Sequence, residues 1–167
     1  MILKKLKEFL DSHNEKYSVV SHSLAYTAEE IANVSHVPRK DMAKTVVVNI
    51  DNKPAIVVLP ASHMIDFKMI KRGVGAEHVS LASETEFNAL FPDCEVGAMP
   101  PFGNLFDMKT LAADVLSKDE YICFNAGTHR ELIKLAYQDF IRLVNPVVMP
   151  LSVERKHTTE DQILELM

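Results

Sequence analysis

The stretch TVVVNI-DNKP-AIVVLP, residues 45–60, decides the fold of this chain. Its two apolar runs, 45–50 and 55–60, are rich in β-branched residues, which favour strands. Between them, residues 51–54 are Asp, Asn, Lys and Pro, which are typical of turns and strand boundaries. The stretch therefore predicts an antiparallel hairpin.

Short helices are expected on both sides of the hairpin. Apolar residues recur at helical spacing near the N-terminus, and a Ser, Thr or Asp precedes the other candidate helices as a cap. The predicted helices are 2–10, 27–34, 67–72, 86–91 and 131–140. Thr128 with Glu131 would cap the last of them, whose buried face would carry Leu132, Ile133, Leu135, Ala136 and Phe140.

Short strands alternate with these helices, which indicates an α+β fold in a single domain. The additional predicted strands are 17–21, 79–81, 110–114 and 120–125. With 167 residues, of which 47% are hydrophobic and 25% charged, the chain can bury one ordinary core without disulfides or metal. We expect the domain to span residues 1–150 and a C-terminal tail, polar and then weakly amphipathic as in a helix, to span 151–167.

The charge balance limits the partners. The 18 Lys and Arg residues against 23 Asp and Glu residues leave a formal charge of −5, which argues against coating of DNA or of an anionic membrane. A small basic patch stays possible. No apolar run approaches the roughly 20 residues that span a bilayer, so no membrane partner is expected.

The cysteines and histidines point to neither a disulfide framework nor a metal centre. The two cysteines, Cys94 and Cys123, show no metal-binding spacing, which suggests a reducing compartment and a cytoplasmic location. The seven histidines include no pair at the spacing that zinc sites use. We expect no metal and no cofactor.

Three segments depart from this plain pattern. Lys44 directly precedes the first strand of the hairpin, where it is either a solvated lysine or a ligand for an anion. The loop 95–106 holds two glycines and two prolines and either connects two elements or presents rigid backbone groups. In 125–132, Asn125, Gly127 and His129 lie where a strand would run into a helix N-terminus, which favours an anion, unless they form a simple turn.

The order of four elements resembles a known family. TAEE (27–30), AKTVVV (43–48), VGAMPPFG (96–103) and FNAGTHRELIKL (124–135) resemble aminoacyl-tRNA deacylases that include YbaK and the editing insertion domain of bacterial prolyl-tRNA synthetase. The resemblance covers about residues 17–145. It implies a mixed, mostly antiparallel, barrel-like sheet surrounded by helices, and hydrolysis of the ester in mischarged tRNA without metal.

The resemblance also assigns residues. It implies that Lys44 is the functional lysine, and that Gly97 and Pro101 bound the catalytic loop. The implied substrate-binding residues are Thr45, Ala98, Met99, Pro100, Phe102, Gly103, Gly127, Thr128 and His129. Because Thr45 stands where some alanine-specific members carry Asn, the amino-acid preference stays open. The expected partners are the acceptor end of an aminoacylated tRNA and an aminoacyl-tRNA synthetase.

Two other functions stay open at this point. The domain could hold a tRNA acceptor end or a synthetase without catalysing a reaction, or it could be an unrelated hydrolase that uses Cys94 or Cys123. If tRNA binds, the acidic net charge confines the contact to a small face. The cations expected at that face are Lys44, Lys68, Lys71, Arg72 and Arg130.

Overall fold

The computed structural model describes residues 3–21, 37–38 and 40–155. Its helices are α1 (Lys4–Ser12), α3 (Phe67–Val74), α4 (Glu84–Leu90) and α5 (Tyr137–Val144), with short 3-10 turns at Gly103–Leu105 and Asp114–Lys118. Its strands are β1 (Ser18–Ser21), β2 (Ala43–Ile50), β3 (Lys53–Pro60), β4 (His63–Ile65), β5 (Val79–Leu81), β6 (Lys109–Ala113), β7 (Tyr121–Asn125), β8 (Glu131–Ala136), β9 (Val147–Met149) and β10 (Ser152–Glu154). This is the expected α+β domain.

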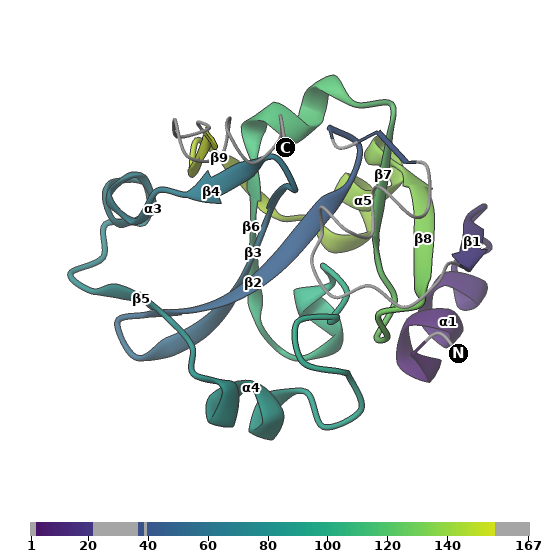
Figure 1. Cartoon of the computed structure of the whole chain (residues 1–167), viewed down its shortest axis with the longest axis horizontal. Helices are drawn as coiled ribbons and strands as arrows, with labels where there is room; N and C mark the ends of the chain where they lie inside the picture. The colour runs from purple at the N-terminus through teal and green to yellow at the C-terminus, as the bar shows by residue number, and fades with distance from the viewer. Residues whose placement is uncertain (1–2, 22–36, 39, 156–167) are drawn as a thin grey trace, which may run out of the picture.

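The predicted hairpin is confirmed, and it forms the middle of the larger sheet (Figure 1). Strands β2 and β3 pair in register from Ala43 opposite Pro60 to Ile50 opposite Lys53. The connection uses Asp51 at φ 47° and Asn52 at φ 67°, the left-handed pair that lets a two-residue turn follow the twist of both strands. Around this hairpin the sheet has the order β5-β2-β3-β6-β9.

A second sheet of order β1-β8-β7 is antiparallel throughout and joins the first through one bridge. The bridge is parallel and pairs Met42, just before β2, with Cys123 in β7. The main core includes Phe102, whose ring centroid lies 6.0 Å from that of Phe9 and 5.5 Å from that of Phe124. This aromatic packing links α1, the loop after α4 and the second sheet.

The capped helices follow the predicted local rules. Asp66 accepts a hydrogen bond from the backbone N–H of Met69 at 3.1 Å and so caps α3. Ser83 and Glu86 form the complete capping box of α4. Helix α3 does not stop at Gly73 as expected but continues to Val74, because the left-handed C-cap is Gly75.

The predicted helix over 131–140 is wrong in its first half. Residues Glu131–Ala136 form strand β8, which is hydrogen-bonded to β7 on one side and to β1 on the other, and only Tyr137–Val144 is helical. A short Leu-Ile-Lys-Leu run fits a buried strand as well as a helix face. Pairing with strands on both sides decided the outcome, so Thr128 is not a helix cap.

Two further expectations need correction, and three others stay predictions. The larger sheet ends at β5 and β9 and is not closed into a barrel in the described part of the chain. Residues Ser152–Glu154 form strand β10, which pairs with β4, so the tail expected to be helical begins with a strand. The helix expected at 27–34 and the rest of the tail lie outside the described residues, and the domain boundary at residue 150 stays a prediction.

Candidate functional site

The bridge between the two sheets brings Lys44 close to Asn125. Met42 and Cys123 belong to a small buried cluster that is separate from the main core. Because side chains alternate along a strand, Lys44 and Asn125, each two residues past the bridge, point to the same side as that cluster. Lys44 is half-buried, and Asn125 is 8% exposed.

The loop 95–101 is hydrogen-bonded directly to the turn between β7 and β8. Glu95 donates its backbone N–H to the carbonyl of Gly127, and Gly127 donates its own to the carbonyl of Ala98, both at 2.9 Å. Within the loop, the N–H of Ala98 donates to the carbonyl of Glu95 at 3.0 Å. Two segments about thirty positions apart in sequence therefore form one backbone unit next to Asn125.

His129 fastens this unit from within. Its Nε2 lies 2.6 Å from the carbonyl oxygen of Val96, and its side chain is almost fully buried. Because a carbonyl oxygen can only accept, Nε2 carries the hydrogen and donates it. Its backbone N–H donates to Oε2 of Glu95 at 3.4 Å. His129 is thus buried and stabilises the loop. It is not an exposed residue of a simple turn, which was the alternative that the sequence left open.

Two glycines of this unit adopt backbone angles that other residues avoid. Gly97 has φ 79° and Gly127 has φ 102°. A Cβ on Gly127 would lie 2.9 Å from Cβ of Leu3, whose N–H donates to the carbonyl of Ala126 at 2.7 Å. A Cβ on Gly97 would meet nothing closer than 3.9 Å. Space is therefore left around Gly97, which is exposed, and not around Gly127.

Backbone donors of the loop point to a role in binding. The N–H groups of Gly97 and Met99 donate to no described residue, although Met99 is only 2% exposed. The next two positions, Pro100 and Pro101, are buried and have no N–H. A buried N–H without an acceptor is rare in proteins, so that of Met99 is suited to an oxygen of a bound molecule. The N–H of the exposed Gly97, two residues earlier, is open to the same ligand.

Other candidate residues have structural contacts that account for them. Phe102 is fully buried in the main core, and Met99 belongs to the same core. The N–H of Gly103 donates to Oγ1 of Thr110 at 3.0 Å, where a side chain would not fit. Thr45 lies on the face of β2 opposite to Lys44. Ala98 is fully buried, and Thr128 is half-buried with Oγ1 3.3 Å from the N–H of Arg130.

His63 is a neighbour of Lys44 that the sequence did not single out as catalytic. Its Nδ1 lies 2.9 Å from Oγ of Ser152, in the adjacent strand β10. Burial lowers the pKa of His63, and the positive charge of Lys44 acts in the same direction. The charge of Glu154, in the same adjacent strand, opposes this lowering of the pKa.

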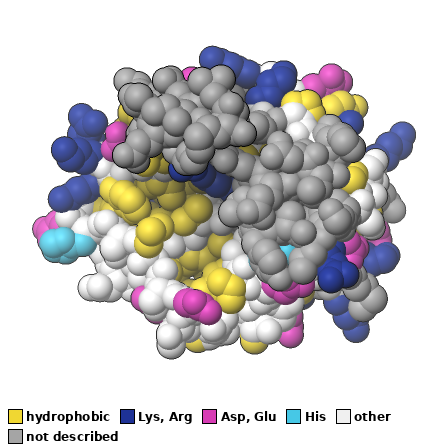
Figure 2. All heavy atoms as spheres, viewed as in Figure 1, with side chains coloured by type: hydrophobic (Ala, Val, Ile, Leu, Met, Phe, Trp, Pro, Cys, Tyr) yellow, Lys and Arg dark blue, Asp and Glu magenta, His cyan; other side chains and the backbone are white. Residues whose placement is uncertain are grey.

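The site is bordered by apolar surface. Figure 2 shows hydrophobic side chains gathered over β2 and toward β5, next to Lys and Arg side chains. Val46 in β2 is partly exposed, and Leu81 in β5 is 58% exposed. An anionic ligand with an apolar part would find both kinds of contact here.

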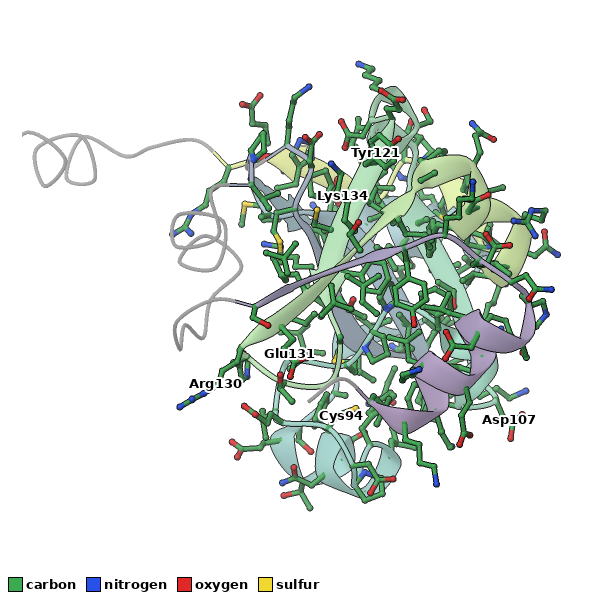
Figure 3. The ribbon with its side chains drawn as sticks, turned by 90° about the vertical axis from the view of Figure 1, so that its right-hand side faces the viewer. Cys94, Asp107, Tyr121, Arg130, Glu131 and Lys134 are labelled. Atoms are coloured by element: carbon green, nitrogen blue, oxygen red, sulfur yellow. The ribbon has the colours of Figure 1, made fainter. Side chains whose placement is uncertain are left out.

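The expected basic face is divided between two places. Lys68, Lys71 and Arg72 are exposed on α3. Arg130 is exposed at the turn end of the β7–β8 hairpin, beside Glu131, whereas Tyr121 and Lys134 lie toward its other end (Figure 3). Figure 1 separates α3 from the end of β8 by the width of the larger sheet. Lys44 lies on the side of β2 that faces Asn125, and Arg130 follows the turn at Gly127, whereas the three cations of α3 are remote from both.

The cysteines are poor candidates for nucleophiles. Burial raises the pKa of Cys94 and of Cys123 to about 11, so at neutral pH both are thiols. Cys94 is half-buried and Cys123 is 2% exposed. These observations count against the thiol hydrolase.

Neither a metal cluster nor a membrane helix is present in the described ranges. No three His, Cys, Asp or Glu side chains of residues 3–21, 37–38 and 40–155 come together in a way that could hold a metal ion. The helices of the same ranges are too short and too polar to cross a membrane.

Asn125 was expected at the end of a strand, but it was not among the catalytic or substrate-binding residues predicted from the sequence. Its Oδ1 is buried and accepts no hydrogen bond from the described residues. The signal that could have identified it is its position two residues before Gly127 at the end of an apolar strand. A polar side chain there needs a partner, and the local sequence offers none.

Most of the chain is similar to known proteins. A family model described as "Aminoacyl-tRNA editing domain" matches residues 22–143. Proline–tRNA ligase of Bacillus cytotoxicus is 31% identical over 84 residues, which are 50% of this chain and 15% of the ligase. Proline–tRNA ligase of Macrococcus caseolyticus is 23% identical over 124 residues, 68% of this chain and 22% of the ligase. The chain thus spans less than a quarter of these curated relatives.

Solved structures share the fold. The crystal structure of a proposed trans-editing enzyme for prolyl tRNA synthetase superimposes with a TM-score of 0.76 at 18% identity, and covers 92% of this chain and 96% of that one. A hypothetical protein superimposes with a TM-score of 0.81 at 19% identity, and covers 90% of this chain and 100% of that one. At such identities the likeness concerns the fold alone.

Proposed function

Because the chain belongs to the aminoacyl-tRNA editing domain family, we propose that it is a hydrolase that cleaves the ester between tRNA and a wrongly attached amino acid. A synthetase pocket rejects a competitor that differs by one methylene by only about 1–3 kcal/mol. A second site that hydrolyses the wrong product supplies the missing discrimination. The substrate would be a mischarged tRNA, and the products a free amino acid and tRNA.

The observation that carries the proposal is the backbone unit made of loop 95–101 and the turn at Gly127. Its two N–H groups without described acceptors, those of Gly97 and Met99, are suited to the negative oxygen that develops when water attacks an ester. Fixed backbone donors need no reorganisation during the reaction, and one good donor is worth about 3–4 kcal/mol in other hydrolases. His129 would support these donors through the carbonyl of Val96.

Lys44 would bind the nucleic-acid end of the substrate. A half-buried ammonium group pairs well with a phosphate or an ester oxygen, and its nearby Met42 and Ala43 are fully buried. Lys44 would therefore orient the acceptor end and not act as the base. The attacking water would be held by carbonyl oxygens of the loop 97–101 and by a hydroxyl group of the terminal ribose.

The proposed partners follow from the same chemistry. The acceptor end of an aminoacylated tRNA would contact Lys44, and the net charge of −5 would keep the contact small. The likeness to parts of proline–tRNA ligases supports a synthetase as second partner. Which amino acid is removed would be decided by a panel of tRNAs charged with Ala, Cys, Ser and Thr.

The test is hydrolysis of that panel by the wild type and by Lys44→Met. The substitution keeps the aliphatic stem and removes the charge, so the fold should persist. Loss of a charged hydrogen bond, about 1.5–3 kcal/mol, predicts a fall in kcat/KM of about tenfold to a hundredfold. Lys109→Met is the matched control. Lys109 is exposed on β6 and pairs with Ala55 near the start of β3, whereas Lys44 pairs with Leu59 near the end of β3.

Unchanged turnover of the Lys44→Met variant would contradict the assigned role. If the wild type releases no amino acid at high enzyme concentration but still retains tRNA in a pull-down, the domain is a binding module and the hydrolase proposal fails.

A further inference from the structure

Asn125 has a buried oxygen that the fold does not use. The residue is 8% exposed, and its Oδ1 has no hydrogen-bond donor among the described residues. A buried polar group in this state costs about 1–3 kcal/mol relative to one that is paired. Unpaired buried atoms are uncommon in native proteins and are often explained by a function.

The position of this oxygen relates it to the proposed site. Asn125 is the last residue of β7 and lies two residues before Gly127, which is hydrogen-bonded to the loop 95–101. Its side chain points to the same side as Lys44, as the bridge between Met42 and Cys123 requires. The oxygen is therefore on the side of the strands that carries Lys44, two residues before the turn that is bonded to the loop.

The surroundings of Asn125 are apolar. Met42, Ala61, Cys123 and Leu132 form the buried cluster on this side, and Leu132 is the β8 partner of Asn125. An aminoacyl ester brings one group that consists only of donors, its α-ammonium. Such a group needs oxygen acceptors wherever water is excluded, and a hydrogen bond from a charged donor is about twice as strong as one between neutral groups.

We propose that Oδ1 of Asn125 accepts a hydrogen bond from the α-ammonium group of the bound amino acid, so that the site selects esters with a free amino group. The inference rests on the proposed function and adds a specificity residue to it. A tRNA whose amino acid is acylated, as in a peptidyl-tRNA, would place a bulky and weaker donor against Asn125. The site would thus hydrolyse aminoacyl-tRNA, whose amino group is free, in preference to peptidyl-tRNA, whose amino group is acylated.

The test measures both hydrolysis and binding. One arm compares kcat/KM for an alanyl-tRNA and its N-acetyl counterpart. The other compares the Kd of 3′-alanylamino-3′-deoxyadenosine, which carries a stable amide, with that of its N-acetyl form by calorimetry. We expect the wild type to favour the free amine about tenfold or more in both arms.

Three variants make the test specific. Asn125→Leu removes the acceptor at similar size and should reduce the preference to about threefold or less, without lowering thermal stability, because no described donor loses a partner. Asn125→Asp keeps an acceptor and should retain the preference for the free amine. Asn88→Leu, at an exposed position of α4, is the control and should behave as the wild type.

The outcomes separate the two proposals. A wild-type preference that persists in Asn125→Leu, or no preference in the wild type, overturns the role of Asn125 while hydrolysis itself still supports the proposed function. If no substrate is hydrolysed but the stable analogue binds with a preference that depends on Asn125, the deacylase proposal fails and the role of Asn125 stands.

Discussion

The glycines at positions 97 and 103 belong to one loop motif, and the structure predicts opposite results for their replacement by alanine. A Cβ on Gly103 would lie 2.3 Å from Oγ1 of Thr110 and 2.4 Å from the backbone oxygen of Met108. The backbone oxygen cannot move without shifting the start of β6. The hydrogen bond from the N–H of Gly103 to Thr110 would be lost with it.

The two costs can be added for Gly103→Ala. Overpacking costs about 1–3 kcal/mol, and a buried donor without its acceptor costs about 1–3 kcal/mol more, so the free energy of unfolding should fall by about 2–6 kcal/mol. At about 2–4 °C per kcal/mol for a chain of this size, Tm should fall by about 10 °C. In Gly97→Ala the new Cβ has room, since the nearest atom lies 3.9 Å away. Only the left-handed angle remains, which costs about 1–2 kcal/mol.

Urea denaturation and calorimetry of both variants measure these values. Deacylation by Gly97→Ala at 20 °C, where that variant stays folded, should fall although it loses only about 1–2 kcal/mol of stability. Alanine keeps the N–H at position 97 but disfavours the angle φ 79° that directs this proposed oxyanion donor. Gly103→Ala, once its unfolded fraction is subtracted, should retain its specific activity. A free energy of unfolding of Gly103→Ala within about 1 kcal/mol of the wild-type value would contradict the predicted clash, and so would a lower stability of Gly97→Ala than of Gly103→Ala.

Two other expectations concern titratable groups. Burial raises the pKa of Cys94 and Cys123 to about 11. Iodoacetamide at pH 7.5 should therefore label neither thiol in the folded protein and both thiols in urea, and the treated native protein should still hydrolyse its substrate. Rapid labelling of the native protein would contradict this prediction. Burial, followed by the charge of Asp41, raises the pKa of Asp119 to about 6 from its ordinary value of 3.8. Since the folded value is the higher one, the Asp119 contribution favours the native state below about pH 4 and declines as pH rises through about 6. Asp119→Asn should therefore stabilise the protein at pH 8 and hardly at pH 4 in urea denaturation, with the exposed Asp93→Asn as control; an equal effect at both pH values would contradict the assignment.

The sequence predicted best those elements whose determinants lie close together in the chain. The β2–β3 hairpin follows from two β-branched runs and a turn whose residues accept positive φ angles. The starts of α3 and α4 follow from side chains that cap the helix three residues away. Local hydrogen bonding decides such features, so no distant partner is needed to predict them.

The strand β8 marks the limit of that reasoning. Its apolar run is compatible with a helix face, and only pairing with β7 and β1 made it a strand. Likewise, the sequence around Gly103 does not reveal that this glycine tolerates no side chain whereas Gly97 has room for one. The difference arises only when the chain folds back and brings the carbonyl of Met108 against Gly103.

The sequence by itself determined the class of the fold, the hairpin that carries Lys44 and the motifs by which the family is identified. The tertiary structure alone decided that the loop at Gly97 and the turn at Gly127 form one hydrogen-bonded unit, that His129 supports it from inside, and that Asn125 faces the side of Lys44. The physical reason is distance along the chain. One bridge relates residues 44 and 125, and two backbone hydrogen bonds join the loop around residue 97 to the turn at residue 127. No local pattern in the sequence encodes either contact.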